Sequence, residues 1–107
     1  MYPTTPDGRY LVVKGQLWRC SNPSLTADAR QRLVEELMAA RRQVKAAKAS
    51  ADSGQLSVAR AKVQKTKVKL GERGPVWWDD GSPDFNRCFV TNTPYADWYL
   101  SSGAAYS

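Results

Sequence analysis

The fold is decided by residues 33–71, which read LVEELMAARRQVKAAKASADSGQLSVARAKVQKTKVKLG. Apolar and small side chains recur along this stretch at alternating spacings of four and three residues, at positions 33, 37, 40, 44 and 47 and again at positions 56, 59, 63, 66 and 70. At 100° per residue, the first five positions fall within an arc of about 80°, which is the narrow seam of a coiled-coil-like helix. We therefore expect two helices that pack along these seams.

Capping residues mark the ends of the two predicted helices. Thr26 is a suitable N-cap for the first helix, and Asp28 lies in its first turn, where a negative charge is favourable. Residues 51–54 break the pattern, and either Asp52 or Ser53 can cap the second helix. Gly71 is a natural stop, because a left-handed glycine often follows a helix C-terminus. These signals predict an antiparallel helical hairpin over residues 25–71.

Residues 1–24 are predicted to form an extended lead-in followed by a β-hairpin. Two short runs, residues 9–14 and 17–21, are rich in branched and aromatic side chains, which favour strands. Gly15 lies between them and can supply the positive φ that a tight two-residue turn needs.

Residues 72–107 form an aromatic and proline-rich segment. The tripeptides at 82–84 and 93–95 both place a hydroxyl N-cap before a proline, so each predicts a helix of about two turns. The predicted fold class is α+β and mostly α, as a single domain over residues 1–107. It consists of an N-terminal β-hairpin, a long antiparallel helical hairpin, and C-terminal short helices and turns.

The composition excludes several classes of site. Histidine is absent from the chain, which removes histidine-based acid–base catalysis, histidine-activated nucleophiles and most zinc sites. Cys20 and Cys88 show no metal-type spacing, so we expect buried reduced thiols, with a disulfide or a reactive thiol as the alternative. No apolar run approaches the roughly 20 residues of a membrane span, and the N-terminus lacks a signal-peptide pattern. We therefore expect a cytoplasmic protein with no cofactor, no metal and no membrane partner.

The net charge of +6 is unevenly distributed. Residues 26–73 contain twelve Lys and Arg against five Asp and Glu, whereas residues 74–107 carry a net charge of −3. A basic middle and an acidic C-terminal segment are consistent with docking of one on the other, and equally with binding of an external polyanion.

Several blocks of the sequence are unusual in composition. They are YLVVKGQLWRCSNP at 10–23, LGERGPVWW at 70–78, DFNR at 84–87 and NTPYADWY at 92–99. Together they resemble a family of small bacterial proteins for which no activity, ligand or mechanism is established. The resemblance implies a real, compact fold and assigns no role to any residue.

The first candidate site is a basic ridge on the helical hairpin. Its second helix has three lysines within about 60° of one another, roughly opposite the apolar seam, and its first helix has a basic flank. Such a ridge can bind a nucleic-acid backbone by releasing counterions, but a charged helix face is more often simply solvated. The candidate residues are Arg41, Arg42, Lys45, Lys48, Lys62, Lys65 and Lys69.

The second candidate site is a polar and aromatic cluster in the C-terminal segment. Paired carboxylates beside aromatic rings are used in glycoside chemistry and can also bind ligands. The alternative is structural, with aspartates in turns and the arginine paired to one of them. The candidate residues are Trp77, Trp78, Asp79, Asp80, Asp84, Asn86 and Arg87.

The third candidate site is a partner surface on the helical hairpin. Val34, Met38, Val58, Ala61 and Val68 lie beside or away from the seams, so a second copy of the chain can cover them in a homodimer. Our functional prediction is a small non-enzymatic interaction module. The alternatives are a nucleic-acid-binding protein that uses the basic face of the hairpin, and a small enzyme or ligand binder that uses the Trp/Asp turn at 77–87.

Overall fold

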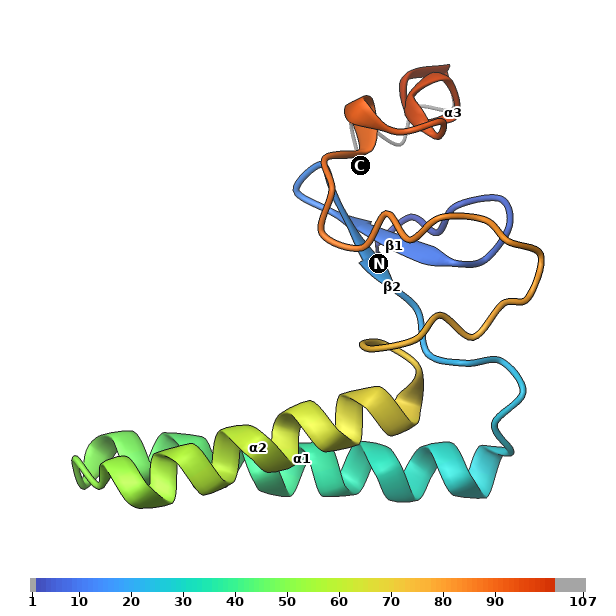
Figure 1. Cartoon of the computed structure of the whole chain (residues 1–107). Coiled ribbons are helices and arrows are strands. Elements are labelled where there is room, and N and C mark those ends of the chain that lie inside the picture. The colour runs from blue at the N-terminus through green and yellow to red at the C-terminus, as the bar shows by residue number, and fades with distance from the viewer. Residues whose placement is uncertain (1, 102–107) are drawn as a thin grey trace. The chain divides into compact units, whose positions relative to one another are not determined.

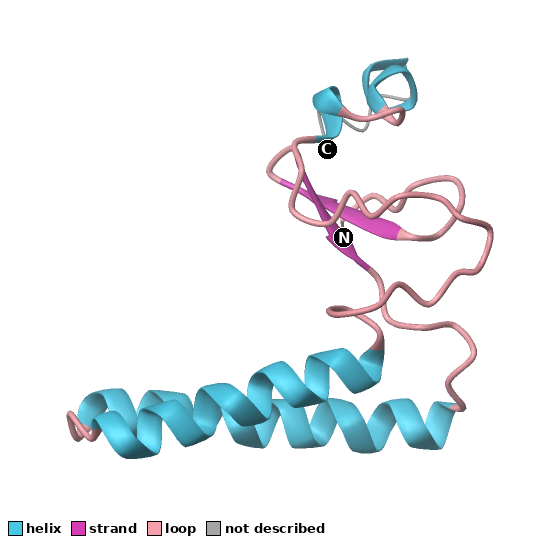
Figure 2. Cartoon of the chain, in the orientation of Figure 1, coloured by secondary structure: helices cyan, strands magenta, loops and turns pink. Residues whose placement is uncertain are grey.

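The computed structural model describes residues 2–101, and the elements within them follow the order β1, β2, α1, α2, η1, α3 (Figure 1). Within these residues, helices contain more of the chain than the single two-stranded antiparallel sheet does (Figure 2). The predicted α+β, mostly α class is therefore confirmed. The chain forms two compact units: Ser21–Trp77 is the hairpin unit, and the residues up to Cys20 with those from Trp78 onward form the sheet unit. The prediction of a single domain stays a prediction.

The hairpin unit consists of α1 (Ala27–Ala49) and α2 (Ser53–Leu70). Thr26 caps α1 as predicted, because its side chain accepts a hydrogen bond from the Ala29 amide at 3.1 Å. All ten predicted seam positions are buried or half-buried, and Leu37, Ala40, Ala47, Ala59, Thr66 and Leu70 are the buried ones. The alternating spacing of four and three residues therefore identified the helix–helix interface correctly.

A short turn joins the two helices. Ser50 is the C-cap of α1, and Ala51 adopts a left-handed conformation with φ of 55°. The Asp52 amide donates back to the Ala47 carbonyl at 3.0 Å, which closes the end of α1. Asp52, rather than Ser53, is the N-cap of α2, since its carboxylate accepts from the Gln55 amide.

Gly71 ends α2 in the left-handed conformation, with φ of 87°, as predicted. The amide of Glu72 then donates to the Lys67 carbonyl, which is the long bond of a Schellman motif. A Cβ on Gly71 would lie 3.0 Å from the Cβ of Asn22 and 3.1 Å from Cδ1 of Trp77. Glycine is therefore required here both by the backbone conformation and by close packing.

The sheet unit is built on β1 (Tyr10–Val13) and β2 (Gln16–Arg19), which pair antiparallel with Val13 opposite Gln16. Lys14 and Gly15 form the two-residue turn with φ of 53° and 76°. Positive φ at both positions is the pattern of a type I′ turn, whose twist suits a tight hairpin. The predicted hairpin is therefore confirmed, with its turn at Lys14-Gly15.

The helix predicted to start at Ser82 is wrong. Residues 82–85 have no regular secondary structure, and residues 87–90 run along the free edge of β2. The Arg87 amide donates to the Leu17 carbonyl at 2.7 Å, and the Leu17 amide donates to the Cys88 carbonyl at 2.9 Å. Pairing with the open edge of β2 satisfies backbone groups of both segments, and this long-range gain overrides the local capping signal.

A 3-10 turn, η1 (Val90–Asn92), and a short helix, α3 (Ala96–Ser101), end the described chain. The second predicted helix is present, but α3 begins at Ala96: Thr93 ends η1, and its hydroxyl and carbonyl accept from the Tyr95 and Ala96 amides in the turn that leads into α3. The core of the sheet unit consists of Tyr10, Val12, Leu17, Trp78 and Val90. Across residues 2–101, the structure has no helix with the length and apolar character needed to cross a bilayer.

Candidate functional site

The positive charge of the protein belongs to the hairpin unit. Residues 21–77 contain twelve Lys and Arg against five Asp and Glu, a net charge of +7. The remaining residues contain four Lys and Arg against five Asp and Glu, a net charge of −1. The two helices α1 and α2 are therefore a basic element joined to a nearly neutral sheet unit.

A groove of about 310 Å³ follows one side of the α1–α2 pair, and we call it the lysine flank. It brings together Lys62, Lys65 and Lys69 of α2 with Glu36 and Gln43 of α1. Its floor includes buried seam residues, so the three lysines border the seam and do not lie opposite it as predicted. Lys62 Nζ lies 3.4 Å from Gln43 Oε1, and no carboxylate in residues 2–101 forms an ion pair with any of the three lysines.

A second groove, of about 430 Å³, is the arginine flank. It is lined by Arg41 and Val44 of α1, by Arg60, Val63 and Gln64 of α2, and by Arg73 of the turn that follows α2. Two half-buried valines from the facing seams supply its apolar part, and three guanidinium groups and one amide supply its polar part. Arg73 Nη1 donates to Gln64 Oε1 at 2.7 Å, which anchors the turn to α2.

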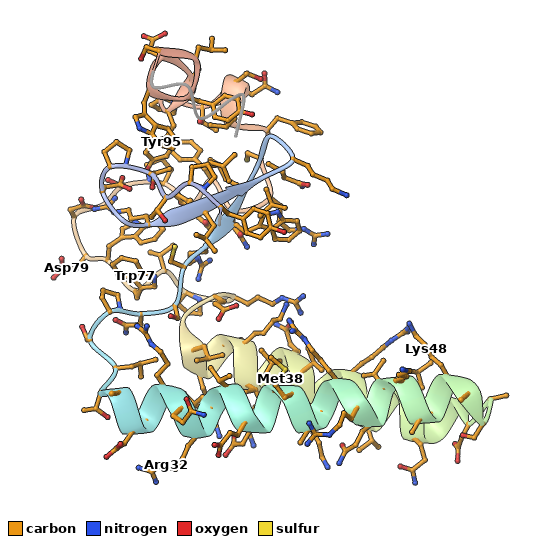
Figure 3. All side chains as sticks on the ribbon, turned by 180° about the vertical axis from the view of Figure 1, so that it is seen from behind. Arg32, Met38, Lys48, Trp77, Asp79 and Tyr95 are labelled. Carbon is orange, nitrogen blue, oxygen red and sulfur yellow. The ribbon has the colours of Figure 1, made fainter. Side chains whose placement is uncertain are left out.

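The other predicted cations do not join one continuous ridge. Lys48 lies at the far end of the helical hairpin (Figure 3), beside a hollow of about 250 Å³ at the inter-helix turn. Arg42 and Lys45 are exposed on α1 and line none of the three grooves. Of the seven predicted residues, the structure therefore groups three lysines on one flank and places Arg41 on the other.

Sequence reasoning missed Arg60, Gln64 and Arg73. Position 60 lies on the side of α2 away from the lysines, and Arg73 lies beyond the end of the helix. The antiparallel arrangement was itself predicted, and it places the middle of α1 across from positions near 60 on α2. Arg60 and Gln64 could therefore have been predicted to lie near Arg41 from the antiparallel alignment of the two helices. The position of Arg73 depends on how the chain turns after Gly71.

The candidate cluster in the C-terminal segment is centred on Trp78, which is buried in the sheet unit. Its ring packs edge-on to Tyr10 with centroids 5.7 Å apart, and its Nε1 donates to the Ser82 carbonyl at 2.8 Å. The guanidinium groups of Arg9 and Arg19 lie 4.7 and 5.9 Å from the ring centroid. Trp78 is thus a core residue with cationic neighbours.

Two of the candidate carboxylates are held by these arginines. Asp80 pairs with Arg9, and this hydrogen bond lowers the pKa of the carboxyl to about 2. Asp84 Oδ2 lies 2.7 Å from Nη2 of Arg19. Asn86 joins the same network, because its Oδ1 accepts from the Arg19 amide at 2.8 Å. The described contacts of Asp80, Asp84 and Asn86 therefore tie the loop after Trp78 to β1 and β2.

The remaining members of that cluster are not brought together with these three. Asp79 is exposed and points outward from its loop (Figure 3). Arg87 was expected to pair with a neighbouring aspartate, but its guanidinium lies over the exposed ring of Trp18, 5.8 Å from the centroid. Trp77 belongs to the hairpin unit, where it packs beside Gly71.

Apolar side chains are exposed on both helices of the hairpin. Met38 is 46% exposed on α1 (Figure 3), and Val58 and Val68 are 53% and 39% exposed on α2. These residues belong to the predicted partner surface, and the homodimer through the helical hairpin stays a prediction. Within residues 2–101, no group of three or more carboxylate or thiol side chains is placed to hold a metal ion.

Comparisons with known proteins identify no relative: no family model, no curated protein and no solved structure matches the chain. The resemblance to a family of small bacterial proteins therefore stays a prediction. Function has to be inferred from the chemistry of the two flanks and of the sheet unit.

Proposed function

We propose that this protein is a non-enzymatic interaction module that binds nucleic acid through the basic face of its helical hairpin. The observation that carries the proposal is the separation of charge. The hairpin unit has a net charge of +7, the rest of the chain has −1, and basic side chains line grooves on two flanks of the helix pair. A phosphate backbone is the polyanion that suits an elongated array of this kind.

The dimensions of the hairpin support this proposal. α1 has 23 residues and α2 has 18. At 1.5 Å per residue, α1 is about 34 Å long, which is close to one turn of a duplex. Cations spread over such a length can contact several phosphates at once, and each contact releases condensed counterions.

The alternative of a small enzyme at residues 77–87 has less support. Asp80 and Asp84 each face an arginine, and the low pKa of Asp80 keeps that carboxylate ionised at neutral pH, so it has no proton to donate. A cytoplasmic location belongs to the same proposal, because no disulfide joins Cys20 and Cys88 and the cytoplasm keeps thiols reduced.

The test is a fluorescence-anisotropy titration against mixed-sequence single-stranded and duplex DNA and RNA at several salt concentrations. Three or more phosphate contacts give a slope of log K against log salt steeper than about −2 on single strands or about −2.7 on duplex. The double variant Lys65→Gln/Lys69→Gln should make the single-strand slope shallower by up to about 1.4. A matched control, Lys14→Gln/Arg87→Gln, removes two exposed charges from the sheet unit and should change the slope far less.

Two outcomes would overturn the proposal. One is the absence of any binding at low salt. The other is an equal loss of affinity in both double variants, because attraction would then follow the net charge of the chain and not the hairpin.

A further inference from the structure

The two flanks of the helical hairpin differ in chemistry, although both are basic. The lysine flank offers ammonium groups beside one carboxylate, that of Glu36. The arginine flank offers three guanidinium groups from three different segments and has no acidic residue in its lining. Lysine is a strongly hydrated point charge, whereas the planar guanidinium can hold two phosphate oxygens at once. A flank of arginines is therefore suited to a defined phosphate contact.

The guanidinium groups of the arginine flank are available for such a contact. In the described residues, Arg41 and Arg60 have neither an ion pair nor a side-chain hydrogen bond, and both are exposed. Arg73 uses one of its five N–H donors on Gln64, and this bond orients the side chain along α2. Positive charge without a carboxylate partner favours an anionic ligand.

The arginine flank also has an apolar floor. Val44 and Val63 are half-buried seam residues that line the same groove as the arginines. The volume of about 430 Å³ is in the range of small-molecule sites, and is large enough for one nucleotide. In a duplex the bases are stacked and paired inside the helix, so an apolar floor beside the phosphates has no base to contact. An unpaired nucleotide can place its phosphate on the arginines and bury the apolar face of its base against the valines.

We infer that the arginine flank is a binding site for single-stranded nucleic acid, in which Arg41, Arg60 and Arg73 hold consecutive phosphates and Val44 and Val63 contact an unpaired base. The lysine flank neutralises phosphates and releases counterions, but it does not fix the position of the strand. This inference rests on the proposed function and adds to it the site, the strandedness of the ligand and the residues that contact it.

The test compares three triple variants with the wild-type protein on one fluorescein-labelled single strand over a range of salt. The first is Arg41→Gln/Arg60→Gln/Arg73→Gln. The second, Lys62→Gln/Lys65→Gln/Lys69→Gln, is the matched control, because it removes three charges from the opposite flank of the same helix pair. The third, Arg41→Lys/Arg60→Lys/Arg73→Lys, keeps the charge and removes the guanidinium forks. Far-UV circular dichroism checks that each variant retains the helical hairpin.

Extrapolation to 1 M salt separates site contacts from counterion release, because the counterion term vanishes there. The lysine variant should converge with the wild type at 1 M salt. At 1 M salt, the arginine-to-glutamine variant should still bind the single strand about tenfold more weakly than the wild type. The arginine-to-lysine variant should keep the wild-type salt slope, but its affinity at 1 M salt should also be about tenfold lower. The wild type should also bind an abasic strand of equal length about tenfold more weakly, because the contact of the base with Val44 and Val63 is lost. The arginine-to-glutamine variant no longer holds the phosphates that position the base, so it should distinguish the two strands less.

The failures of the inference and of the proposed function are distinguishable. Equal losses in the two glutamine variants that both vanish at 1 M salt would overturn the arginine site and leave nucleic-acid binding by the hairpin intact. Tighter binding of duplex than of single strand would also overturn the site. No binding of any strand by the wild type at low salt would overturn both.

Discussion

Arg19 Nη2 lies 2.7 Å from Asp84 Oδ2, and the Arg19 side chain is only 2% exposed, whereas that of Asp84 is 37% exposed. The pair joins the inner face of β2 to the loop after Trp78, and the guanidinium lies 5.9 Å from the Trp78 ring centroid. A buried cation needs a counter-charge, because desolvation of an unpaired charge is costly. The fold of residues 78–86 therefore depends on β2 through this contact.

Asp84→Ala should destabilise the protein strongly, because it leaves the buried Arg19 without its carboxylate. Removing one partner of a buried ion pair costs about 3–5 kcal/mol, and the partial exposure of Asp84 reduces our expectation to about 2–3 kcal/mol. Urea denaturation followed by tryptophan fluorescence measures this change. Asp79→Ala is the matched control, since Asp79 is exposed, and it should change stability by less than about 0.5 kcal/mol. Similar effects of the two substitutions would contradict a structural role for the Arg19–Asp84 pair.

Gly71→Ala and Gly54→Ala should change stability in opposite directions. Gly71 has φ of 87° and is surrounded by Asn22 and Trp77, so a methyl group there adds backbone strain and crowding that cost about 2 kcal/mol or more. Gly54 lies in the first turn of α2, where a new Cβ would meet only Asp52 Oδ1, at 3.5 Å. Alanine at position 54 should therefore stabilise the helix by about 0.5 kcal/mol. Thermal unfolding monitored at 222 nm compares them, and a stabilising Gly71→Ala would refute the assigned conformation.

The Arg9–Asp80 pair predicts a loss of stability in acid. The hydrogen bond from Arg9 lowers the pKa of Asp80 from 3.8 to about 2 in the folded protein. A lowered folded-state pKa gives a stabilisation that is complete above the unfolded value and is lost as the pH falls from about 4 towards 2. Asp80→Asn should therefore make the free energy of unfolding less dependent on pH over that interval. A series of urea titrations between pH 2 and 6 tests this, and identical profiles for the variant and the wild type would count against the pair.

Tyr10 predicts a separate loss of stability in alkali. Burial of the ring, and then the proximity of Asp84, raise the pKa of Tyr10 from 10.0 to about 12, and its oxygen accepts the Phe85 amide hydrogen at 2.8 Å. A raised folded-state pKa gives a stabilisation that is complete below about pH 10 and is lost as the pH rises towards 12. Tyr10→Phe should cost about 1 kcal/mol at neutral pH and should weaken the alkaline dependence. Guanidinium chloride unfolding at pH 7 and between pH 9 and 12 measures both effects. An unchanged alkaline profile in Tyr10→Phe would show that other groups cause it.

Periodicity and capping were enough to predict the hairpin unit. The seam from Leu33 to Ala47, the seam from Leu56 to Leu70, and the caps at Thr26 and Gly71 all act within one or two helical turns, so they are readable without knowledge of distant residues. The β-hairpin was predictable for the same reason, since a turn with glycine at its second position and two β-prone runs are local signals.

The errors came where a distant partner outweighed a local signal. Ser82-Pro83 has the pattern of a helix start, but residues 87–90 form backbone hydrogen bonds and an isolated bridge with the free edge of β2, and the Tyr10 hydroxyl accepts from the Phe85 amide. The predicted pairing of Arg87 with an aspartate failed similarly, because Arg9 and Arg19, more than 60 residues away in sequence, occupy the carboxylates of Asp80 and Asp84. No spacing rule connects residues so far apart.

By itself, the sequence determined the class of the fold, the helical hairpin with its interface, and the concentration of positive charge between residues 26 and 73, because helix periodicity, capping and charge are properties of short segments. Only the tertiary structure decided how that charge is arranged: it placed some of the basic residues on a lysine flank and others on an arginine flank, and brought Arg73 beside Gln64. The physical reason is that a groove forms between elements, so its lining depends on how two helices and a turn pack together and not on the pattern along any one of them.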